Sequence, residues 1–427
     1  MCKLALSSLS PENYPFDVNL LPQPVYLVGG AVRDAILGRK RETSLRDTSP
    51  REISREYLDL DFILPQDAVK FARKLAAHYK AGFVLLDKER EIARVVFPNA
   101  TVDIAQQEGN SLETDLRRRD FTVNAIAFNP HTQELIDPLQ GYDDIGKGIL
   151  RMVSSKNLED DPLRLMRGYR QAAQLGFTLD SETQVTIRQL APLLGQVATE
   201  RFRTELGYML VNSQGTQWIV QAWEDGLLAP FFKNATREGC EYLLKVDAAA
   251  VQLTQTWQEL GIELNKYVRD TIKTTWLGIA KLACLVSSEP ETAEIELTEL
   301  TYSRAEIKSI TTALKLFPKF SKLEMPLREQ YFLFQEAGFV FPTTSVLAVA
   351  RDKLVEGIAP LITRYLNPDD PVAHPTLLVS GKELIVALNI PASPIIGKLL
   401  AEIAIAQVEG KISTPEDAIV FAQELIE

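Results

Sequence analysis

The chain has 427 residues, of which 46% are hydrophobic and 24% charged, a composition that is ordinary for a globular protein of roughly two to four domains. There is no apolar run of about 18 residues, no secretory signal pattern, and only three widely spaced cysteines, which predicts a cytoplasmic protein without a membrane span, a disulfide framework or a zinc site. The net charge of −11 argues against a broad nucleic-acid-binding surface, so a nucleic-acid partner would have to be bound through local basic stripes.

The first predicted unit is a strand, a glycine turn and a helix. Val25–Val28 is a short apolar run between a proline and a glycine, which indicates a buried strand. Gly29 and Gly30 allow a tight turn and a close backbone approach, and a helix is predicted over 31–37. Free N–H groups at such a turn can bind phosphate, and Arg33, one turn into the helix, can add a forked contact.

Two aspartates follow on a predicted strand. Before them, Arg39–Tyr57 is rich in charges of both signs and is expected to be an exposed loop. In Leu58–Leu64, LDLDFIL, residues two apart share a face of the strand, so Asp59 and Asp61 point the same way. Two like charges at such close range repel each other unless a cation lies between them, and carboxylates beside a phosphate site indicate Mg²⁺.

The next segment is expected to complete a small sheet. A helix is predicted over 67–79, and short strands over 83–86, 92–97 and 101–105. The last of these strands carries Asp103. If it lies beside the strand with the two aspartates, three carboxylates converge and could complete a two-metal site.

Arg117–Ala125, RRRDFTVNA, joins a basic run to an acid and an amide. Arg118 and Arg119 can pair with phosphate, whereas Asp120 and Asn124 can bond the hydroxyl groups of a ribose. A site of this kind would select ribonucleotides over deoxyribonucleotides.

Two other motifs are expected to be structural. Asp137–Asp144, DPLQGYDD, has a proline and a glycine at turn positions and would close the first domain. Ala198–Leu206 carries Glu200, Arg201 and Glu205 at helical spacings, which indicates a stabilising role.

Leu158–Phe177 is predicted to be one helix with Pro162 near its start. Four charged residues recur there at every third position and lie near one another: Asp161, Arg164, Arg167 and Arg170. Cytosine and adenine both present an amino donor beside a ring-nitrogen acceptor, so the carboxylate of Asp161 and the guanidinium of Arg164 can bond either base. Guanine and uracil present the opposite order, which would leave buried groups unpaired, and polar sites reject such mismatches by up to about 10⁴-fold.

From Trp218 onward the hydrophobic periodicity is almost all helical, with prolines between the runs. The amphipathic runs are 218–228, 240–260, 270–287, 303–316, 327–337 and 345–366. No carboxylate cluster or glycine turn of the kind seen above occurs in this half of the sequence. Near its end, Gly397 and Lys398 precede an apolar helix and could receive RNA phosphate.

The motifs at 29–34 (GGAVRD), 59–61 (DLD) and 118–125 (RRDFTVNA) resemble the nucleotidyltransferase head of the class II tRNA nucleotidyltransferases and bacterial poly(A) polymerases, in the polymerase-β-like superfamily. Residues 160–164 are similar to that family's E-D-x-x-R motif, with Asp160 in place of its glutamate. The resemblance implies an α+β fold, in which a small mixed-sheet head is followed by an all-α neck, body and tail. The implied domains are the head at 1–150, a helical neck with the nucleobase-recognition helix at 151–215, a helical body at 216–320 and a tRNA-binding tail at 321–427.

The resemblance also implies a role for each motif. Asp59 and Asp61 would hold two Mg²⁺ ions, and Asp103 would be the third catalytic carboxylate. The residues implied in binding nucleotide phosphate or ribose are Gly29, Gly30, Arg33, Asp34, Arg118, Arg119, Asp120 and Asn124. Those implied in base recognition are Asp160, Asp161, Arg164, Arg167 and Arg170. The partners would be CTP and/or ATP and the 3′ end of tRNA.

The implied reaction is the template-independent addition of nucleotides to the 3′ end of tRNA, to build or repair its CCA end. Only 14 residues separate Asp103 from Arg118, and in this family a shortened connection is associated with enzymes that add CC alone. We therefore favour CC addition over complete CCA addition or A addition. A poly(A) polymerase would be expected to have a more basic C-terminal region, and a non-catalytic RNA-binding relative would not need clustered acids beside its RNA.

Overall fold

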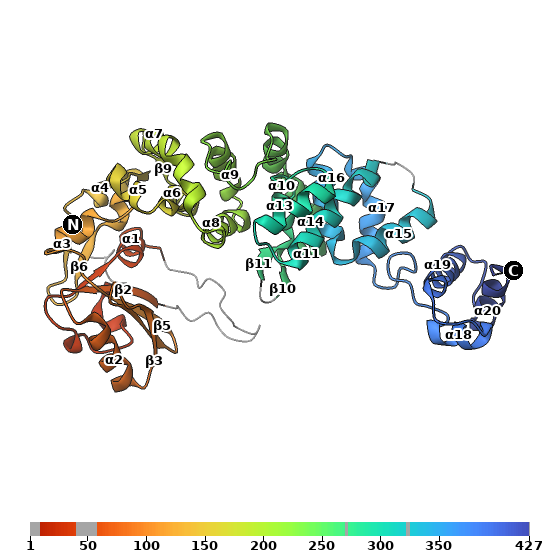
Figure 1. The fold of residues 1–427 in the computed structure, drawn as a ribbon, viewed down its shortest axis with the longest axis horizontal. Helices are drawn as coiled ribbons and strands as arrows, with labels where there is room; N and C mark the ends of the chain where they lie inside the picture. Colours follow the sequence, from red (N-terminus) through yellow and green to blue (C-terminus); the bar gives the residue numbers. More distant parts are fainter. Residues whose placement is uncertain (1–8, 40–57, 270–271, 322–324, 427) are drawn as a thin grey trace. The chain divides into compact units, whose positions relative to one another are not determined.

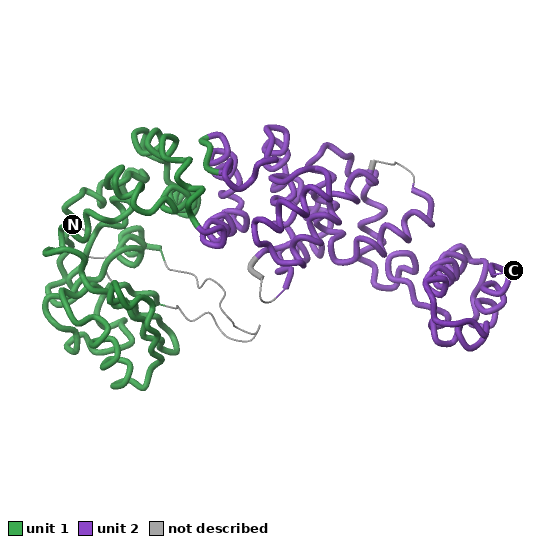
Figure 2. Tube along the Cα trace, in the orientation of Figure 1, with its two compact units in different colours: residues 1–197, 225–227 green, residues 198–224, 228–427 purple. Residues whose placement is uncertain are grey.

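The computed structural model describes residues 9–39, 58–269, 272–321 and 325–426. The predicted charged loop Arg39–Tyr57 therefore lies, apart from Arg39, outside the described residues. The chain forms two compact units: unit 1 is residues 1–197 with 225–227, and unit 2 is residues 198–224 with 228–427 (Figure 2).

Unit 1 is built on a seven-stranded sheet (Figure 1). In spatial order its strands are β3 (Gly82–Asp87), β4 (Ile92–Phe97), β5 (Ala100–Gln106), β2 (Leu58–Leu64), β1 (Tyr26–Val28), β6 (Ala127–Asn129) and β7 (Glu134–Ile136). β2 and β5 are parallel, whereas the other neighbouring strands are antiparallel. The predicted mixed sheet is confirmed, and the parallel pair puts the two acid-bearing strands side by side.

Helices surround this sheet and continue beyond it. They are α1 (Gly30–Ile36), α2 (Ala68–Tyr79), α3 (Leu112–Arg117), α4 (Gly141–Lys147), α5 (Ser155–Asp160), α6 (Leu163–Leu175) and α7 (Ser181–Leu190), with short 3₁₀ turns at Pro11–Asn13, Val18–Leu20, Thr122–Asn124 and Ala191–Gln196. The strands β8 (Ile149–Leu150) and β9 (Thr178–Leu179) form a separate parallel pair. Buried aromatic rings pack together under β2, where Phe62 contacts Tyr14 and Phe16 at centroid distances of 5.6 and 5.9 Å.

The prediction of one helix over Leu158–Phe177 is wrong, because α5 ends at Asp160 and α6 begins at Leu163. Between them Asp161 is extended, with φ −137° and ψ 90°. A residue before proline is sterically disfavoured in the helical conformation, and Pro162 follows Asp161. Asp161 therefore lies ahead of α6, whereas Arg164 lies in its first turn and donates its backbone N–H to the Asp161 carbonyl at 2.9 Å.

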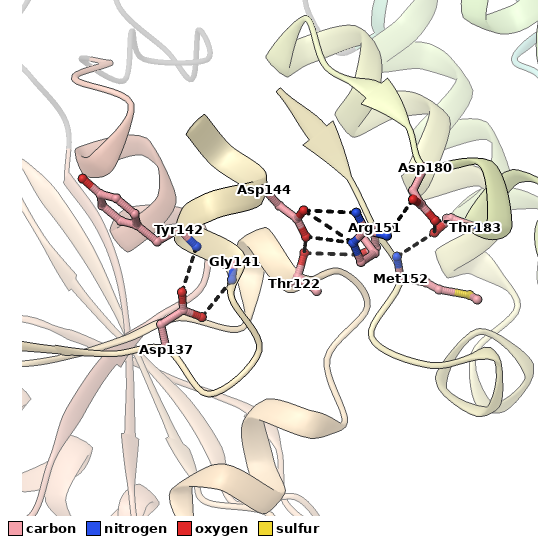
Figure 3. A network of polar contacts seen from close by, with 9 residues as sticks. All are labelled: Thr122, Asp137, Gly141, Tyr142, Asp144, Arg151, Met152, Asp180 and Thr183. Atoms are coloured by element: carbon pink, nitrogen blue, oxygen red, sulfur yellow. Dashed lines mark hydrogen bonds and ion pairs between the residues drawn. The ribbon is translucent and has the colours of Figure 1, made fainter. Parts of the chain in front are cut away.

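The motif at 137–144 is a structural turn, as predicted. Asp137 accepts hydrogen bonds from the N–H groups of Gly141 and Tyr142, at 2.9 and 2.8 Å, where α4 begins (Figure 3). A Cβ on Gly141 would lie 2.2 Å from the carbonyl oxygen of Thr122, so a larger residue does not fit here. The polar network that joins this region to the start of α7 consists of Thr122, Asp144, Arg151, Met152, Asp180 and Thr183.

We expect Gly141→Ala to lower the free energy of unfolding by about 1–3 kcal/mol, since the added methyl overlaps a backbone carbonyl. Gly146 is the matched control, because it lies on the same helix, is exposed and has no atom within 4 Å of a Cβ built on it. Gly146→Ala should instead stabilise the chain by about 0.5–1 kcal/mol. Urea denaturation of the three proteins measures the difference, and equal effects at the two positions would contradict the steric argument.

Unit 2 is mostly helical. Its helices are α8 (Thr199–Val211), α9 (Gly215–Glu224), α10 (Arg237–Thr256), α11 (Gln258–Asn265), α12 (Trp276–Leu282), α13 (Pro290–Glu299), α14 (Arg304–Leu316), α15 (Leu327–Ala337), α16 (Phe341–Ala350), α17 (Val355–Leu366), α18 (Gly381–Leu388), α19 (Pro394–Val408) and α20 (Pro415–Glu424), with 3₁₀ turns at Phe317–Ser321 and Gly338–Val340. The last three helices enclose their own apolar cluster around Leu384, Ile403 and Ala418.

The predicted helical runs of this half coincide with most of its helices up to Leu366, but no run covers α13, α18 or α20. The run 270–287 was wrong at its start, where β11 (Ile272–Thr275) pairs with β10 (Tyr267–Arg269) in an antiparallel hairpin. The sequence IKTT is rich in β-branched residues, which favour strands. Helix α13 was not predicted, although Pro290 at its first position is a typical start signal.

Among the described residues, one stretch, Leu327–Ala350, is apolar enough to cross a membrane by length and composition alone, and it was not predicted from the sequence. Its most apolar 18 residues are 61% buried. It is interrupted at Gly338, whose φ is +46°, and the residues of α16 that follow are almost all buried against other helices of unit 2. This is the environment of a core helix.

Candidate active site

The glycine turn, an aspartate and an arginine meet at one point of unit 1. Gly29 has φ +73°, a left-handed conformation that L side chains rarely adopt. A Cβ on Gly29 would lie 3.5 Å from Arg119 Nη1 and 3.6 Å from Asp61 Oδ2. The absence of a side chain at Gly29 therefore leaves open a cradle between a guanidinium and a carboxylate.

The parallel pairing of β2 and β5 brings the predicted acids together. Asp61 lies in register with Asp103, and Asp59 lies in register with Thr101. Since residues two apart share a face, all four side chains project from the same side of the sheet. The Thr101 hydroxyl donates to Asp59 Oδ1 at 2.9 Å, which fixes the orientation of that carboxylate.

Asp103 has a partner that the sequence analysis missed. Arg94, opposite it on β4, donates from Nε to Asp103 Oδ1 at 2.7 Å and from Nη2 to Asp103 Oδ2 at 2.8 Å. The hydrogen bond to Asp103 is the main cause that raises the pKa of Arg94, and the charges of Asp59 and Asp61 add to it. The role of Asp103 as a third catalytic acid stays a prediction, and in this arrangement its charge is balanced by Arg94.

The residues at this point fit a divalent cation. Asp59 and Asp61 present hard oxygen donors from one strand face beside an open cradle, and Mg²⁺ typically binds through one or two carboxylates together with substrate phosphates. No group of three His, Cys, Asp or Glu side chains within the described ranges is arranged to hold a metal. A pair of carboxylates completed by phosphate oxygens is therefore the donor set that this geometry favours.

A buried polar network holds the residues predicted to bind ribose. Asn124 donates from Nδ2 to Asp120 Oδ1 and to Gln171 Oε1, both at 2.8 Å, and accepts from Arg33 Nη1 at 2.7 Å. Arg167 donates to Asp120 Oδ2 from Nε and Nη2, at 3.0 and 2.8 Å. The structure thus brings Asp120 and Asn124 together. Their hydrogen bonds to Arg167 and Gln171 connect α6 to Arg117–Ala125, which is called the arginine motif below.

The Asp120 carboxyl has a lowered pKa. Burial alone would raise the pKa of this carboxyl, but the charge of Arg167 and the hydrogen bonds from Asn124 and the Phe121 N–H outweigh it and hold the pKa at about 2. Because this value lies below the ordinary one, the stability that the carboxylate contributes is complete above about pH 4 and is lost as the pH falls towards 2.

We expect Asp120→Asn to lower the free energy of unfolding at pH 7 by about 2 kcal/mol. We expect this difference from wild type to shrink between about pH 4 and pH 2, since the wild-type carboxyl is protonated there too. Urea denaturation at pH 7, 4 and 3 measures it, and Asp143→Asn, an exposed residue of α4, is the control. A difference that does not depend on pH would contradict the proposed ionisation.

A second cluster clamps the arginine motif. Asn157, which is buried, donates from Nδ2 to the carbonyls of Arg117 and Arg119, at 2.7 and 2.8 Å. Arg164 donates from Nη1 to the carbonyls of Arg118 and Asn157, at 2.8 and 3.1 Å. Arg164 is therefore anchored at one end of its guanidinium group.

The other predicted site residues are more dispersed. Asp160 is exposed on α5 and pairs with Lys156 at 2.9 Å, and Arg170 donates to Gln174 at 2.5 Å. Arg118 is paired with Glu108, which lies just after β5. Arg33 forms an ion pair with Asp34, the next residue of α1, at 2.7 Å.

Five residues that contact the predicted site residues were not predicted: Arg94, Thr101, Asp115, Asn157 and Gln171. Gln171 follows Arg167 by four positions on α6, a spacing at which helical side chains are neighbours, so this residue could have been identified. Arg94 and Asp103 lie opposite each other in the antiparallel pair of β4 and β5. The register of this pair depends on the turn between the two strands, so the sequence alone does not show which residues face each other.

Comparison with known proteins places these motifs in a family. Three family models match the chain. The poly A polymerase head domain matches residues 25–151. The probable RNA and SrmB-binding site of polymerase A matches residues 176–238, and the putative tRNA nucleotidyltransferase domain 2 matches residues 270–422. The chain is also similar to solved structures, among them a CCA-adding enzyme with ATP, at a TM-score of 0.71 and 21% identity over 95% of this chain and 92% of the other. At that identity the likeness shows the fold, which confirms the predicted mixed-sheet and helical architecture.

Curated relatives match over nearly the whole length. The A-adding tRNA nucleotidyltransferase of Deinococcus radiodurans is 29% identical over 95% of this chain and 96% of its own. The CC-adding tRNA nucleotidyltransferase of Synechocystis sp. is 46% identical over 418 residues, covering 97% of this chain and 96% of its own. On this similarity the chain belongs to the tRNA nucleotidyltransferase family.

Proposed function

We propose that this protein adds nucleotides from CTP to the 3′ end of tRNA and stops after CC. The observation that carries the proposal is the 46% identity, over nearly the full length of both chains, to a CC-adding tRNA nucleotidyltransferase. The short connection between Asp103 and Arg118 also supports the proposal. This connection contains the helix α3, whose first turn is capped by the Ser111 hydroxyl.

A firmly held connection is consistent with a pocket that serves one base. Gln107 donates its N–H to the Leu64 carbonyl at 2.7 Å, and Glu108 donates its N–H to Asp115 at 3.0 Å. Arg118 is paired with Glu108. A pocket that changes from C to A would need a connection that moves, and these contacts oppose such movement.

Members of this family generally use a divalent metal ion. We propose that Asp59 and Asp61 hold a pair of Mg²⁺ ions and that Asp103 is the third acid of the site. When bound, the metal would make the terminal hydroxyl a better nucleophile and neutralise charge on the departing pyrophosphate. Thr101 would keep Asp59 in the binding orientation through its hydrogen bond.

The remaining residues would bind and orient the nucleotide. The turn at Gly29 and Gly30 lets the backbone approach the triphosphate closely, and Arg119, whose Nη1 faces that turn, would pair with a phosphate. Asp120 and Asn124 would orient the ribose through the network that also holds Arg33. Additional phosphate contacts are proposed for Arg33 and Arg118, and Asp34 would support Arg33.

Base selection is proposed for the start of α6. Asp161 would accept from the amino group of cytosine, and Arg164 would donate to its ring nitrogen. The anchoring of Arg164 Nη1 on two carbonyls supports this role, because a fixed guanidinium discriminates better than a mobile one. Arg167 would act by holding Asp120, while Asp160 and Arg170 would line the nucleotide site.

The domain division is proposed with the same boundaries as above: head 1–150, neck 151–215, body 216–320 and a tail at 321–427 that contacts tRNA. The predicted cytoplasmic location agrees with a tRNA substrate. Cys240 and Cys284 are free and buried, as expected in a reducing compartment.

The test is incorporation by purified protein on three tRNAs, lacking CCA, ending in C and ending in CC. Each is supplied with CTP, ATP or both, in the presence of Mg²⁺, and an Asp59→Ala/Asp61→Ala variant is the control. Growth that stops at CC supports the proposal. Full CCA would make the chain a complete CCA-adding enzyme, one A on the CC substrate an A-adding enzyme, and a long A ladder a poly(A) polymerase. No incorporation would favour a non-catalytic RNA-binding relative.

A further inference from the structure

Asp115 is a buried carboxylate in the connection between β5 and the arginine motif. It lies on α3 and is 8% exposed. Its Oδ1 accepts the Glu108 N–H at 3.0 Å, and its Oδ2 lies 3.1 Å from Arg119 Nη2. One side chain therefore fixes both the backbone of the connection and the position of Arg119.

Arg119 lies between two carboxylates. Its Nη2 is bound to Asp115, whereas its Nη1 and the Oδ2 of Asp61 both approach the position that a Cβ on Gly29 would occupy, at 3.5 and 3.6 Å. Within the described part of the chain, Arg119 Nε is buried without a hydrogen-bond partner. Asp115 thus holds a guanidinium group that has donor capacity left and lies close to a carboxylate of the proposed metal site.

We propose that Asp115 is a positioning residue that keeps Arg119 from pairing with Asp61 and so from competing with a divalent metal ion for that carboxylate. The inference rests on the proposed function, since it assigns Asp61 to the metal site. A largely buried guanidinium needs a counter-charge, because an unpaired charge is costly to bury. When the charge at Asp115 is removed, Asp61 becomes the counter-charge, and Arg119 then occupies the oxygen that the metal would bind.

The helix α3 supplies a matched control. Glu113 and Arg117 form the same (i, i+4) carboxylate–arginine pair at 2.7 Å, but both side chains are more than half exposed. In the pair of Asp115 and Arg119 the side chains are 9% and 24% exposed. The two pairs share the spacing and the charge types, and both carboxylates lie on α3, whereas Arg119 lies just beyond the end of this helix. The pairs differ in burial and in the proximity of Arg119 to the acids.

The experiment measures Mn²⁺ binding to the full chain without nucleotide, from the electron paramagnetic resonance signal of free Mn²⁺. Asp115→Asn keeps an oxygen that accepts from Glu108 but loses the charge that holds Arg119. We expect its Kd for Mn²⁺ to be about 10-fold weaker than that of wild type. In Asp115→Asn/Arg119→Gln the competing cation is gone, so the Kd should return to the wild-type value or below it. Glu113→Gln should not change it.

The outcomes separate the two proposals. If wild type binds Mn²⁺ and Asp61→Asn weakens that binding, the metal site of the proposed function stands. An unchanged Kd in Asp115→Asn would then overturn the inference alone, and so would a weakened Kd that Arg119→Gln does not restore, since the effect would then be structural. If wild type does not bind Mn²⁺, or if Asp61→Asn binds it equally well, both the metal site and the inference fail.

Discussion

Replacing Asp61 with asparagine is expected to lower kcat for CTP incorporation by about 10³-fold or more. Asp61 lies in register with Asp103 and beside the Gly29 cradle, where its carboxylate is proposed to bind the metal. Asparagine keeps the size of the side chain and removes its charge. A carboxylate-bound divalent ion contributes several kcal/mol of charge stabilisation in the transition state, and each 1.4 kcal/mol is about tenfold in rate. Single-turnover extension of a tRNA that lacks CCA measures the loss.

Asp87→Asn is the control for this variant. Asp87 ends β3 in the same sheet, and its carboxylate accepts from the N–H groups of Glu89 and Arg90 in an exposed turn. We expect this variant to extend tRNA at the wild-type rate. A kcat of Asp61→Asn that equals that of wild type would exclude Asp61 as a ligand of the metal. Circular dichroism would show whether a loss of activity is caused by unfolding.

The acid pair itself was predictable, because the two-residue period of a strand places Asp59 and Asp61 on one face without further information. The position of Asp103 was predictable only as a possibility. β2 and β5 are neighbours although β3 and β4 lie between them in sequence, and such a crossover depends on how the whole sheet packs. The structure places Asp103 beside Asp61, but it also places Arg94 against Asp103, which shows that sheet register determines the charge of the site.

The polar partners of the arginine motif were not predictable by the same means. Asn157 contacts backbone carbonyls 38 and 40 residues before it, and Gln171 contacts Asn124 47 residues before it. Helical spacing places Gln171 beside Arg167, but asparagine and glutamine carry no charge, so a single sequence gives no signal of which carbonyl or amide they will bind. Motifs that act locally, such as the turn at Asp137, were predicted correctly because turn geometry depends on neighbouring residues.

The break before α6 has a consequence for specificity. A continuous helix would have placed Asp161 and Arg164 on one helical face, but Pro162 leaves Asp161 extended and free of the helical repeat. Arg164 is then held through carbonyls of the arginine motif, which is itself clamped by Asn157. Arg164, one of the proposed base-reading residues, is therefore positioned by the proposed phosphate-binding segment as well as by α6, which would connect base and phosphate recognition through the backbone.

The discrimination of CTP from UTP is expected to fall in two steps as this pair is changed. In Asp161→Asn the amide can turn its NH₂ towards the O4 of uracil, but Arg164 still faces the ring N–H of uracil with a donor. We expect the ratio of kcat/KM values for CTP and UTP to fall by about 10²-fold. In Asp161→Asn/Arg164→Gln both groups can match uracil, and the ratio should fall by up to about 10⁴-fold. Steady-state kinetics with each nucleotide on one tRNA measures both.

The interpretation depends on whether kcat/KM changes for UTP, for CTP or for both. If Asp161 and Arg164 read the base, the variants gain activity with UTP, which a loss of folding cannot produce. Glu159→Gln, an exposed carboxylate of α5, should keep the wild-type ratio. Arg164 also donates to two carbonyls, so the double variant is expected to lose some activity with both nucleotides in addition to its change in ratio. An equal loss with CTP and UTP at an unchanged ratio would mean that the pair only supports the fold and that the base is selected elsewhere.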